Sequence, residues 1–157
     1  MTRFNLRVYA LIINEFEEIL ISDECRFGKF FSKFPGGGVE NNEGIQEALF
    51  RELEEELKLL ISKASFYYFN EFHQASAFDN SNLVAFYYLI YIQKKELELP
   101  AEAYTIPFDQ EMEKQRWVSL RALKVSDLTF PIDRLVLEKL QADLLCSWEL
   151  ENALFKK

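Results

Sequence analysis

The stretch from Gly36 to Leu59, GGGVENNEGIQEALFRELEEELKL, constrains this chain more than any other part of it. Three glycines lead into a helical pattern whose last two turns carry Glu52, Glu55 and Glu56. Residues three and four positions apart share one face of a helix, so these carboxylates project together. Clustered carboxylates repel one another unless a cation lies between them. Mg²⁺ held by carboxylates and substrate phosphates is a common arrangement of this kind.

The same stretch predicts how its helix packs. We expect the helix to run from about Gly44 to about Leu57, with an apolar stripe at Ile45, Ala48, Leu49, Leu53 and Leu57. Arg51 lies four residues before Glu55, which is the spacing of a helical ion pair. Because the acidic face lies beside the apolar stripe, we expect the carboxylates at the edge of a cleft.

The length and net charge of the chain limit the kinds of protein it can be. The 157 residues are most simply one domain over residues 1–157. A formal net charge of −8 argues against binding to nucleic acid or to an anionic membrane, since both require basic patches. Cys25 and Cys146 lack metal-ligand or redox spacing and indicate free thiols. The apolar N-terminal run is too short to span a bilayer, so we expect a cytoplasmic protein.

Apolar patterns on both sides of the helix predict strands. These strands are expected over Phe4–Asn14, Glu18–Asp23, Ser65–Phe78, Leu83–Ile92 and Arg116–Leu120. Cys25–Lys33 and Pro107–Gln115 are expected to be loops, and a second helix is expected from Pro131 to about Trp148. This order predicts an α+β or α/β fold in which a mixed sheet lies between helices.

The opening stretch resembles the Nudix box, the signature of the Nudix hydrolase family. That signature reads Gly, five residues, Glu, seven residues, Arg-Glu, aliphatic, any, Glu-Glu, any, Gly, aliphatic. From Gly37 through Glu43 to Leu59, the chain matches eight of its nine defined positions without a gap. The departure is Lys58, where the family usually has glycine. A left-handed lysine there would cost roughly 1 kcal/mol, unless the helix continues through Leu59.

The resemblance implies a Nudix-like α/β/α sandwich with a mixed β-sheet, and it implies an enzyme. The expected reaction is metal-dependent hydrolysis of a diphosphate bond in a nucleoside diphosphate linked to another group, with water attacking phosphorus. Mg²⁺ or Mn²⁺ is the expected cofactor, because metal ions polarise phosphoryl oxygens and lower the pKa of bound water. A small nucleotide-type molecule is the expected partner, and a homodimer is left open beside a monomer.

The resemblance also implies a metal site. Its expected ligands are Glu52, Glu55 and Glu56, with the carbonyl of Gly36 or Gly37 completing the shell. A solvated acidic helix face is the alternative interpretation.

Catalytic roles are expected for Glu55 and Glu56, with Arg51 in a supporting role and Glu43 either at the metal or in a network at the helix start. The general base is left open between a glutamate of the box and the acidic loop. That loop offers Asp109, Glu111 and Glu113, of which Glu111 and Glu113 are candidates for an extra metal ligand or the base.

Two lysines and two aromatic residues are candidates for substrate binding. Lys29 and Lys33 precede the box and could meet the phosphates, whereas Phe31 and Phe78 could stack on a base. Loop solvation and core packing are the alternative interpretations. His73 is the only histidine, so the chain has no histidine pair.

Other functions compete with catalysis. A non-catalytic sensor module that binds a nucleotide or nucleotide sugar would share the fold, but the intact glutamates favour hydrolysis. An isoprenoid diphosphate isomerase on the same fold would need a longer chain. After Pro35 the next proline is Pro100, which does not support the ADP-ribose subgroup.

Overall fold

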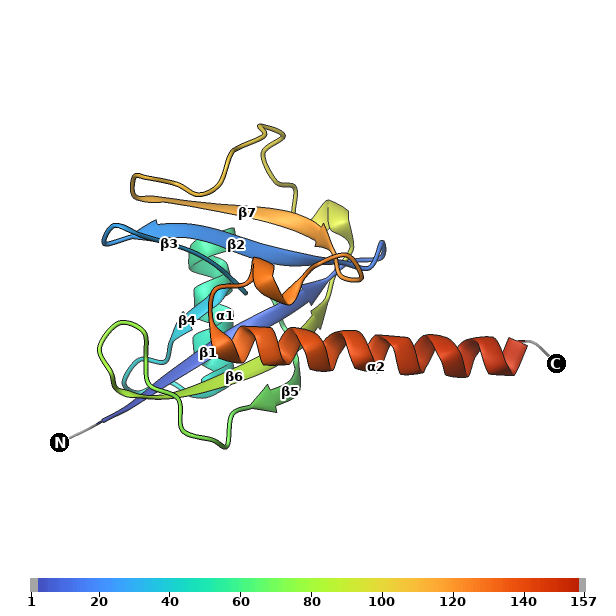
Figure 1. Cartoon of the computed structure of the whole chain (residues 1–157), viewed down its shortest axis with the longest axis horizontal. Coiled ribbons are helices and arrows are strands. Elements are labelled where there is room, and N and C mark those ends of the chain that lie inside the picture. The colour runs from blue at the N-terminus through green and yellow to red at the C-terminus, as the bar shows by residue number, and fades with distance from the viewer. Residues whose placement is uncertain (1–2, 156–157) are drawn as a thin grey trace.

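The computed structural model describes residues 3–155. Seven strands form its sheet: β1 (Phe4–Ile13), β2 (Glu18–Arg26), β3 (Lys29–Lys33), β4 (Gly36–Gly38), β5 (Ser65–Phe69), β6 (Asn82–Tyr91) and β7 (Met112–Ser119). Two α-helices, α1 (Ile45–Leu57) and α2 (Pro131–Phe155), lie on opposite sides of the sheet (Figure 1). Short 3₁₀ turns cover Lys94–Glu96 and Val125–Asp127.

The alternation of side chains along β1 explains the two layers. Val8, Ala10 and Ile12 are fully buried on the side of α1, against Leu49 and Leu53. The intervening residues of β1 face the other way, into a second core with Ile132, Val136, Leu137 and Leu140 of α2. Successive side chains of a strand point to opposite faces, so an apolar run of this length must be covered twice. The expected α/β/α sandwich with a mixed sheet is confirmed.

The sheet opens beside β1, and this opening positions the site. β1 pairs with β6 in parallel along its whole length, from Phe4↔Asn82 to Ile13↔Tyr91. Its pairing with β2 is limited to Ile13↔Ile19, because β4 occupies the same edge of β1 further down. β2 instead lies between β3 and β7. The strands β1 and β2 therefore diverge on either side of β4.

Four sequence-based boundaries need correction. Cys25–Lys33 is not a loop, because Cys25 and Arg26 continue β2 and a hairpin follows into β3. The strand expected over Ser65–Phe78 ends at Phe69. The strand expected at Arg116 begins at Met112, where it pairs with Cys25, so Glu113 belongs to β7 and not to a loop. α2 extends past Trp148 to Phe155.

The end of α1 settles how the chain accommodates Lys58. Its φ of 54° and ψ of 30° are left-handed, the conformation that glycine usually supplies at a helix end. The Lys58 N–H donates to the Glu54 carbonyl at 3.0 Å, and the Leu59 N–H donates to the Leu53 carbonyl at 3.3 Å. The helix therefore stops at Leu57 although a lysine follows it.

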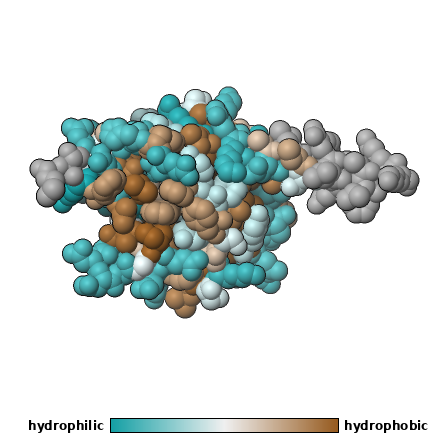
Figure 2. Space-filling view, turned by 90° about the horizontal axis from the view of Figure 1, so that it is seen from below, coloured by the Kyte–Doolittle hydropathy of each residue, from teal (hydrophilic) through white to brown (hydrophobic). Residues whose placement is uncertain are grey.

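Aromatic side chains remain exposed at the edge of the sheet. Phe66 and Phe69 on β5 and Phe72 just beyond it are 54%, 38% and 45% exposed. The face of the molecule seen from below shows apolar side chains beside hydrophilic ones (Figure 2). Within residues 3–155, no helix combines the length and the hydropathy that crossing a membrane requires.

Candidate active site

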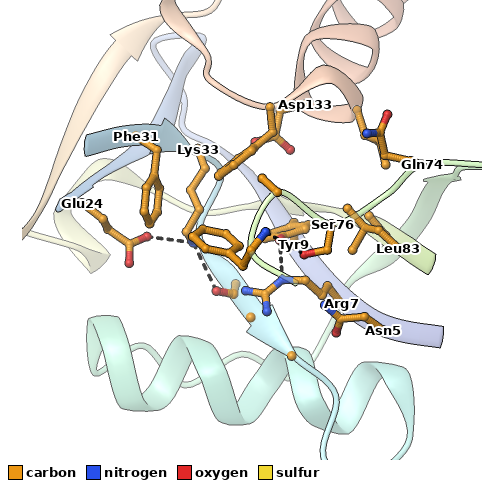
Figure 3. Close-up of a pocket in the computed structure, with 18 of the residues that line it drawn as sticks. Asn5, Arg7, Tyr9, Glu24, Phe31, Lys33, Gln74, Ser76, Leu83 and Asp133 are labelled. Atoms are coloured by element: carbon orange, nitrogen blue, oxygen red, sulfur yellow. Dashed lines mark hydrogen bonds and ion pairs between the residues drawn. The ribbon is translucent and has the colours of Figure 1, made fainter. Parts of the chain in front are cut away.

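A cavity of about 460 Å³ occupies the opening between β1 and β2. Side chains of β1, β2, β3, β6 and α1, the glycines of β4, the segment before β6 and the start of α2 line its walls (Figure 3). Glu24, Glu52 and Glu56 lie on its wall together with Lys33. The cavity therefore has an acidic region, to which one buried lysine contributes.

Arg51 holds the start of the box and α1 together. Its Nε and Nη2 donate to the two oxygens of Glu43 at 2.9 and 2.7 Å. Its Nη1 donates to Glu52 at 3.0 Å and to Glu55 at 3.3 Å, and its Nη2 also donates to the Gly38 carbonyl at 3.0 Å. These hydrogen bonds from Arg51, with one from the Glu40 N–H, lower the pKa of Glu43 to about 2. Arg51 thus orients Glu43, Glu52 and Glu55, whereas Glu56 is not bonded to it.

One carboxylate oxygen of Glu56 lacks a hydrogen-bond partner within the part of the chain that the structure describes. Its Oε2 is buried and has no hydrogen-bond partner among residues 3–155. Burial raises the pKa of Glu56 to about 8; the charges of Glu113, Glu52 and Glu24 add to this rise, and Lys33 opposes it. A buried carboxylate without a partner is costly in a protein whose polar groups are otherwise paired. This oxygen is therefore available to a cation or to a hydrogen-bond donor without losing a partner among the described residues.

Glu52 lies directly against the glycine strand. A Cβ on Gly37 would stand 2.5 Å from the Glu52 carboxylate carbon, so this position leaves no room for a side chain. Glu55 points outward and its side chain is 60% exposed. Across the part of the chain that the structure describes, no three acidic, histidine or cysteine side chains already stand in a metal-binding arrangement.

The donor set nevertheless fits a hard divalent cation. Oxygen ligands from carboxylates and carbonyls are those that Mg²⁺ prefers. Glu52 and Glu56 would supply the anionic part of such a set, with the bound ion displacing the proton that the raised pKa of Glu56 favours. Of the expected ligand set, Glu52, Glu56 and the glycines Gly36 and Gly37 line the cavity. Glu55 does not line it and is hydrogen-bonded to Arg51.

A second group of charged residues lies on β2, β3 and β7. Glu24 is 2% exposed and stands opposite Glu113 in the β2–β7 register. Arg26 bridges them, with Nε 3.0 Å from Glu24 and Nη2 3.3 Å from Glu113. Lys33 Nζ lies 3.0 Å from the other Glu24 oxygen. Burial, and after it the charge of Glu24, raises the pKa of Glu113. Like charges opposite each other in a sheet require such cations.

The candidates for substrate binding are two phenylalanines and two lysines, and they differ in whether they reach the cavity. Phe31 and Phe78 both line the cavity and form an edge contact with ring centroids 5.8 Å apart. Phe130 packs on both, at 5.4 and 6.1 Å. Lys33 lines the cavity but is 5% exposed, whereas Lys29 is exposed and does not reach the cavity wall.

Of the acidic-loop candidates, Glu113 lies nearest the site. Its charge acts on Glu56, and it accepts hydrogen bonds from Ser22 at 3.5 Å and Gln115 at 3.1 Å. Asp109 and Glu111 are exposed and lie outside the cavity lining. The structure thus brings Glu113 close to the box and leaves Glu111 apart from it.

Sequence reasoning missed a buried carboxylate at the start of α2. Asp133 is 2% exposed and lines the cavity (Figure 3). It accepts a 2.5 Å hydrogen bond from the Tyr87 hydroxyl. Its Oδ2 is buried and unpartnered among the described residues. Burial raises the pKa of Asp133 to about 6. An acidic residue in a first helical turn normally indicates only a favourable helix start, so this position carries no further sequence signal.

Sequence reasoning also missed Glu24. It lies in the segment after Asp23, where the expected strand stopped too early. If the expected strand is continued beyond Asp23, its side chains keep alternating between the two faces of the sheet. Glu24 then lies on the same face as Leu20 and Ser22. That extension was the available indication for a buried acidic residue facing β7.

Comparison with known proteins identifies the family. The NUDIX domain model matches residues 3–140. An RNA pyrophosphohydrolase of Shewanella frigidimarina is 38% identical over 56 residues, which are 36% of this chain and 31% of that protein. The corresponding protein of Shewanella pealeana is 39% identical over 56 residues, with the same 36% and 31% coverage. The chain thus spans about a third of the length of the curated relatives it matches.

Solved structures share the fold over most of the chain. The Escherichia coli ORF135 protein superposes with a TM-score of 0.65 at 19% identity, covering 90% of this chain and 91% of that one. A MutT protein of Methanosarcina mazei Go1 gives 0.64 at 20% identity, covering 90% and 96%. Such low identities establish a common fold and nothing more. The family model supplies the assignment: this chain belongs to the Nudix family.

Proposed function

We propose that the chain hydrolyses the diphosphate bond of a nucleoside diphosphate linked to another group, with Mg²⁺ or Mn²⁺ as cofactor. The observation that carries this proposal is the buried, unpartnered oxygen of Glu56 on the wall of the cavity. An anionic diphosphate can approach an acidic cavity only if a cation lies between the two. The names of the Shewanella relatives, RNA pyrophosphohydrolases, agree with this class of bond.

Glu52 and Glu56 would hold the metal ion, which would neutralise the diphosphate and lower the pKa of bound water. Glu55 serves as the third ligand or as the base, since its exposed carboxylate is held by a single 3.3 Å hydrogen bond from Arg51. Arg51 keeps Glu52 oriented and joins it to Glu43. The carbonyl of Gly36, also proposed for this shell, accepts a hydrogen bond from Lys33 instead.

The attacking water needs a proton acceptor. Two carboxylates are candidates: Glu55 at the solvent side of α1 and Glu113 on β7. Glu113 is half-buried with a raised pKa, which suits a general base better than an ordinary exposed carboxylate does. Glu111 is kept as a weaker proposal for an additional ligand, because its exposed side chain would need the preceding loop to move.

The aromatic part of the cavity would hold the base of the substrate. Phe78 is 53% exposed on the cavity wall and rests edge-on against buried Phe31. A planar base could stack on Phe78, and the unpartnered Asp133 oxygen could accept a hydrogen bond from it. Lys29, outside the wall, is proposed only for the phosphate tail of a longer substrate.

A Mg²⁺-dependent phosphate-release screen tests the proposal. The panel comprises nucleoside triphosphates, nucleotide sugars, dinucleoside polyphosphates and RNA with a 5′-triphosphate. Turnover of at least one compound is expected from the native chain, with strong loss in Glu55→Gln and in Glu56→Gln. Glu54→Gln, an exposed neighbour on α1 outside the cavity, is the matched control. Nucleotide binding without turnover would favour the sensor module instead.

Assembly and location remain predictions. A homodimer is supported by the exposed aromatic side chains of β5, and light scattering at several protein concentrations would test it. A reducing, cytoplasmic setting is proposed from the cysteines, since Cys25 is buried and Cys146 is exposed with neither in a disulfide.

A further inference from the structure

Lys33 is buried on the cavity wall with all of its hydrogen-bond donors engaged. Its ammonium lies 3.0 Å from Glu24 Oε2, and it donates to the carbonyls of Phe34 at 3.2 Å and Gly36 at 3.3 Å. An ammonium group has three protons, so these partners leave none for a substrate phosphate. Figure 3 shows the side chain of Lys33 reaching from β3 toward Glu24 and the glycine strand.

The oxygens around this ammonium are of the kind that bind a hard metal ion. We call Glu24 Oε2 and the carbonyl oxygens of Phe34 and Gly36 the Lys33 cradle. One carboxylate and two backbone carbonyls resemble a partial shell for a divalent cation. The Tyr9 ring, 5.5 Å from Nζ, closes another side of the ammonium by a cation–π contact.

The Lys33 cradle adjoins the carboxylates of the proposed metal site. Gly36 precedes Gly37, whose backbone lies against the Glu52 carboxylate. Lys33 lines the cavity wall together with Glu52 and Glu56, and its ammonium pairs with Glu24. The Lys33 ammonium therefore adjoins both groups of glutamates.

We propose that Lys33 is a fixed cation that takes the place of one divalent ion in the acidic part of the cavity. Its ammonium occupies the Lys33 cradle and so keeps Glu24 and the Gly36 carbonyl from binding metal. The chain then binds one divalent ion fewer than these oxygens would hold. The inference rests on the proposed function only in treating Glu52 and Glu56 as the adjoining metal site.

Counting bound Mn²⁺ tests this directly. Metal-free protein is titrated with Mn²⁺, and free Mn²⁺ is measured by electron paramagnetic resonance. Lys33→Met removes the charge and the three polar contacts that hold the side chain in the cradle, and the flexible thioether can move aside. The variant should therefore bind one more Mn²⁺ per chain than the wild type does. Arg26→Met is the matched control, because Arg26 pairs with the other oxygen of Glu24 but contacts neither carbonyl. It should leave the number of bound ions unchanged.

Folding of the variants is checked by melting in the absence and presence of Mn²⁺. Lys33→Met leaves Glu24 with Arg26 as its one paired cation among the described residues, beside a 3.4 Å hydrogen bond from the Ser22 hydroxyl. The variant should therefore melt lower without metal and gain more from Mn²⁺ than the wild type. The double variant Lys33→Met/Glu24→Gln removes both charges, so it should recover part of the melting temperature that Lys33→Met loses. It should not bind the extra ion. If Lys33→Met cannot be purified folded without metal, refolding it with and without Mn²⁺ gives the same comparison.

Each outcome decides the inference. An unchanged number of ions in Lys33→Met overturns it, and so does an equal gain in Arg26→Met, which would show a general effect of charge. If the wild type binds no Mn²⁺ but Lys33→Met binds one, the fixed-cation role holds and the proposed metal-dependent function fails. If both bind the same single ion, the proposed function survives and this inference does not.

Discussion

The guanidinium of Arg51 donates two hydrogen bonds, of 2.9 and 2.7 Å, to the carboxylate of Glu43, which lies eight residues earlier in the chain. The pair ties the segment before α1 to the middle of the helix. Arg51 also donates a hydrogen bond to Glu52, so it positions a carboxylate on the wall of the cavity. The arginine in the box is thus a positioning residue whose planar fork matches the carboxylate.

Arg51→Lys should disturb both the fold and the site. Lysine cannot form the two parallel bonds to Glu43 and also reach Glu52, so the melting temperature should fall by roughly 3–6 °C. The rate of hydrolysis should fall by about 10–100-fold, as expected when the partner of a metal ligand is lost. Arg121→Lys, in an exposed pair with Glu17, is the control. Equal behaviour of the two variants in melting and turnover would contradict a positioning role.

The adjacent glycines Gly36 and Gly37 should respond differently to alanine. Gly36 has a φ of +144°, and a Cβ there would lie 2.1 Å from the Val8 carbonyl, so Gly36→Ala should lose the soluble folded protein. At Gly37 the atoms nearest to such a Cβ would be those of the flexible Glu52 carboxylate, at 2.5 Å. Gly37→Ala should fold but bind Mn²⁺ about 10-fold more weakly. Circular dichroism and Mn²⁺ titration separate the two, and a Gly37→Ala variant with native Mn²⁺ affinity would refute this placement of Glu52.

Lys58→Gly should stabilise the protein. Lys58 is left-handed at a φ of 54°, which costs a non-glycine residue roughly 1 kcal/mol. Glycine should therefore raise the free energy of unfolding by about that amount, less its extra freedom in the unfolded chain. Urea unfolding measures the difference. Lys63→Gly, outside α1, should give no such gain, and a destabilised Lys58→Gly would mean that the lysine side chain contributes more than its backbone costs.

Asp133 should give the protein a specific pH dependence. Its folded pKa of about 6 lies above the ordinary 3.8, so the native state binds more protons than the unfolded chain between these values. The stability from this group is complete below about pH 4 and is lost as pH rises through 6, by about 3 kcal/mol in all. Asp133→Asn should remove this slope in urea unfolding measured from pH 4 to 7. Asp109→Asn, on the exposed loop, should keep it; an unchanged slope in Asp133→Asn would contradict the assignment.

Strong local patterns made much of the fold predictable. The apolar run of β1 and the stripe of α1 were located within a residue or two because burial on one or two faces leaves a clear periodicity. The acidic face of α1 was placed at a cavity edge by the same reasoning, and the structure puts Glu52 and Glu56 there.

The missed hairpin has a local cause. Residues Phe27 and Gly28, between β2 and β3, both have positive φ, of 54° and 72°. A two-residue turn of this kind usually carries asparagine or aspartate before glycine. Phenylalanine in that position hides the turn, so the segment read as a loop. Because the hairpin was not predicted, the burial of Lys33 and the pairing of Glu24 with Glu113 were not predicted either.

Other features depend on contacts between distant parts of the chain. β5 ends early because the Asn70 side chain takes over the edge of β6, accepting from the Ala85 N–H at 2.8 Å and donating to the Leu83 carbonyl at 2.9 Å. Asp133 meets Tyr87 across 46 positions. No pattern within a short window reports such pairs, so the place of Asp133 on the cavity wall became visible only in three dimensions.

The central claim is that the unpartnered carboxylate of Glu56 binds the divalent metal. Titration calorimetry of Mn²⁺ into the wild type, Glu56→Gln and Glu54→Gln at one fixed pH tests it most directly. Glu56→Gln should bind Mn²⁺ about 100-fold more weakly, because a neutral amide replaces an anionic ligand, while Glu54→Gln should bind as the wild type does. Wild-type affinity in Glu56→Gln would contradict the account.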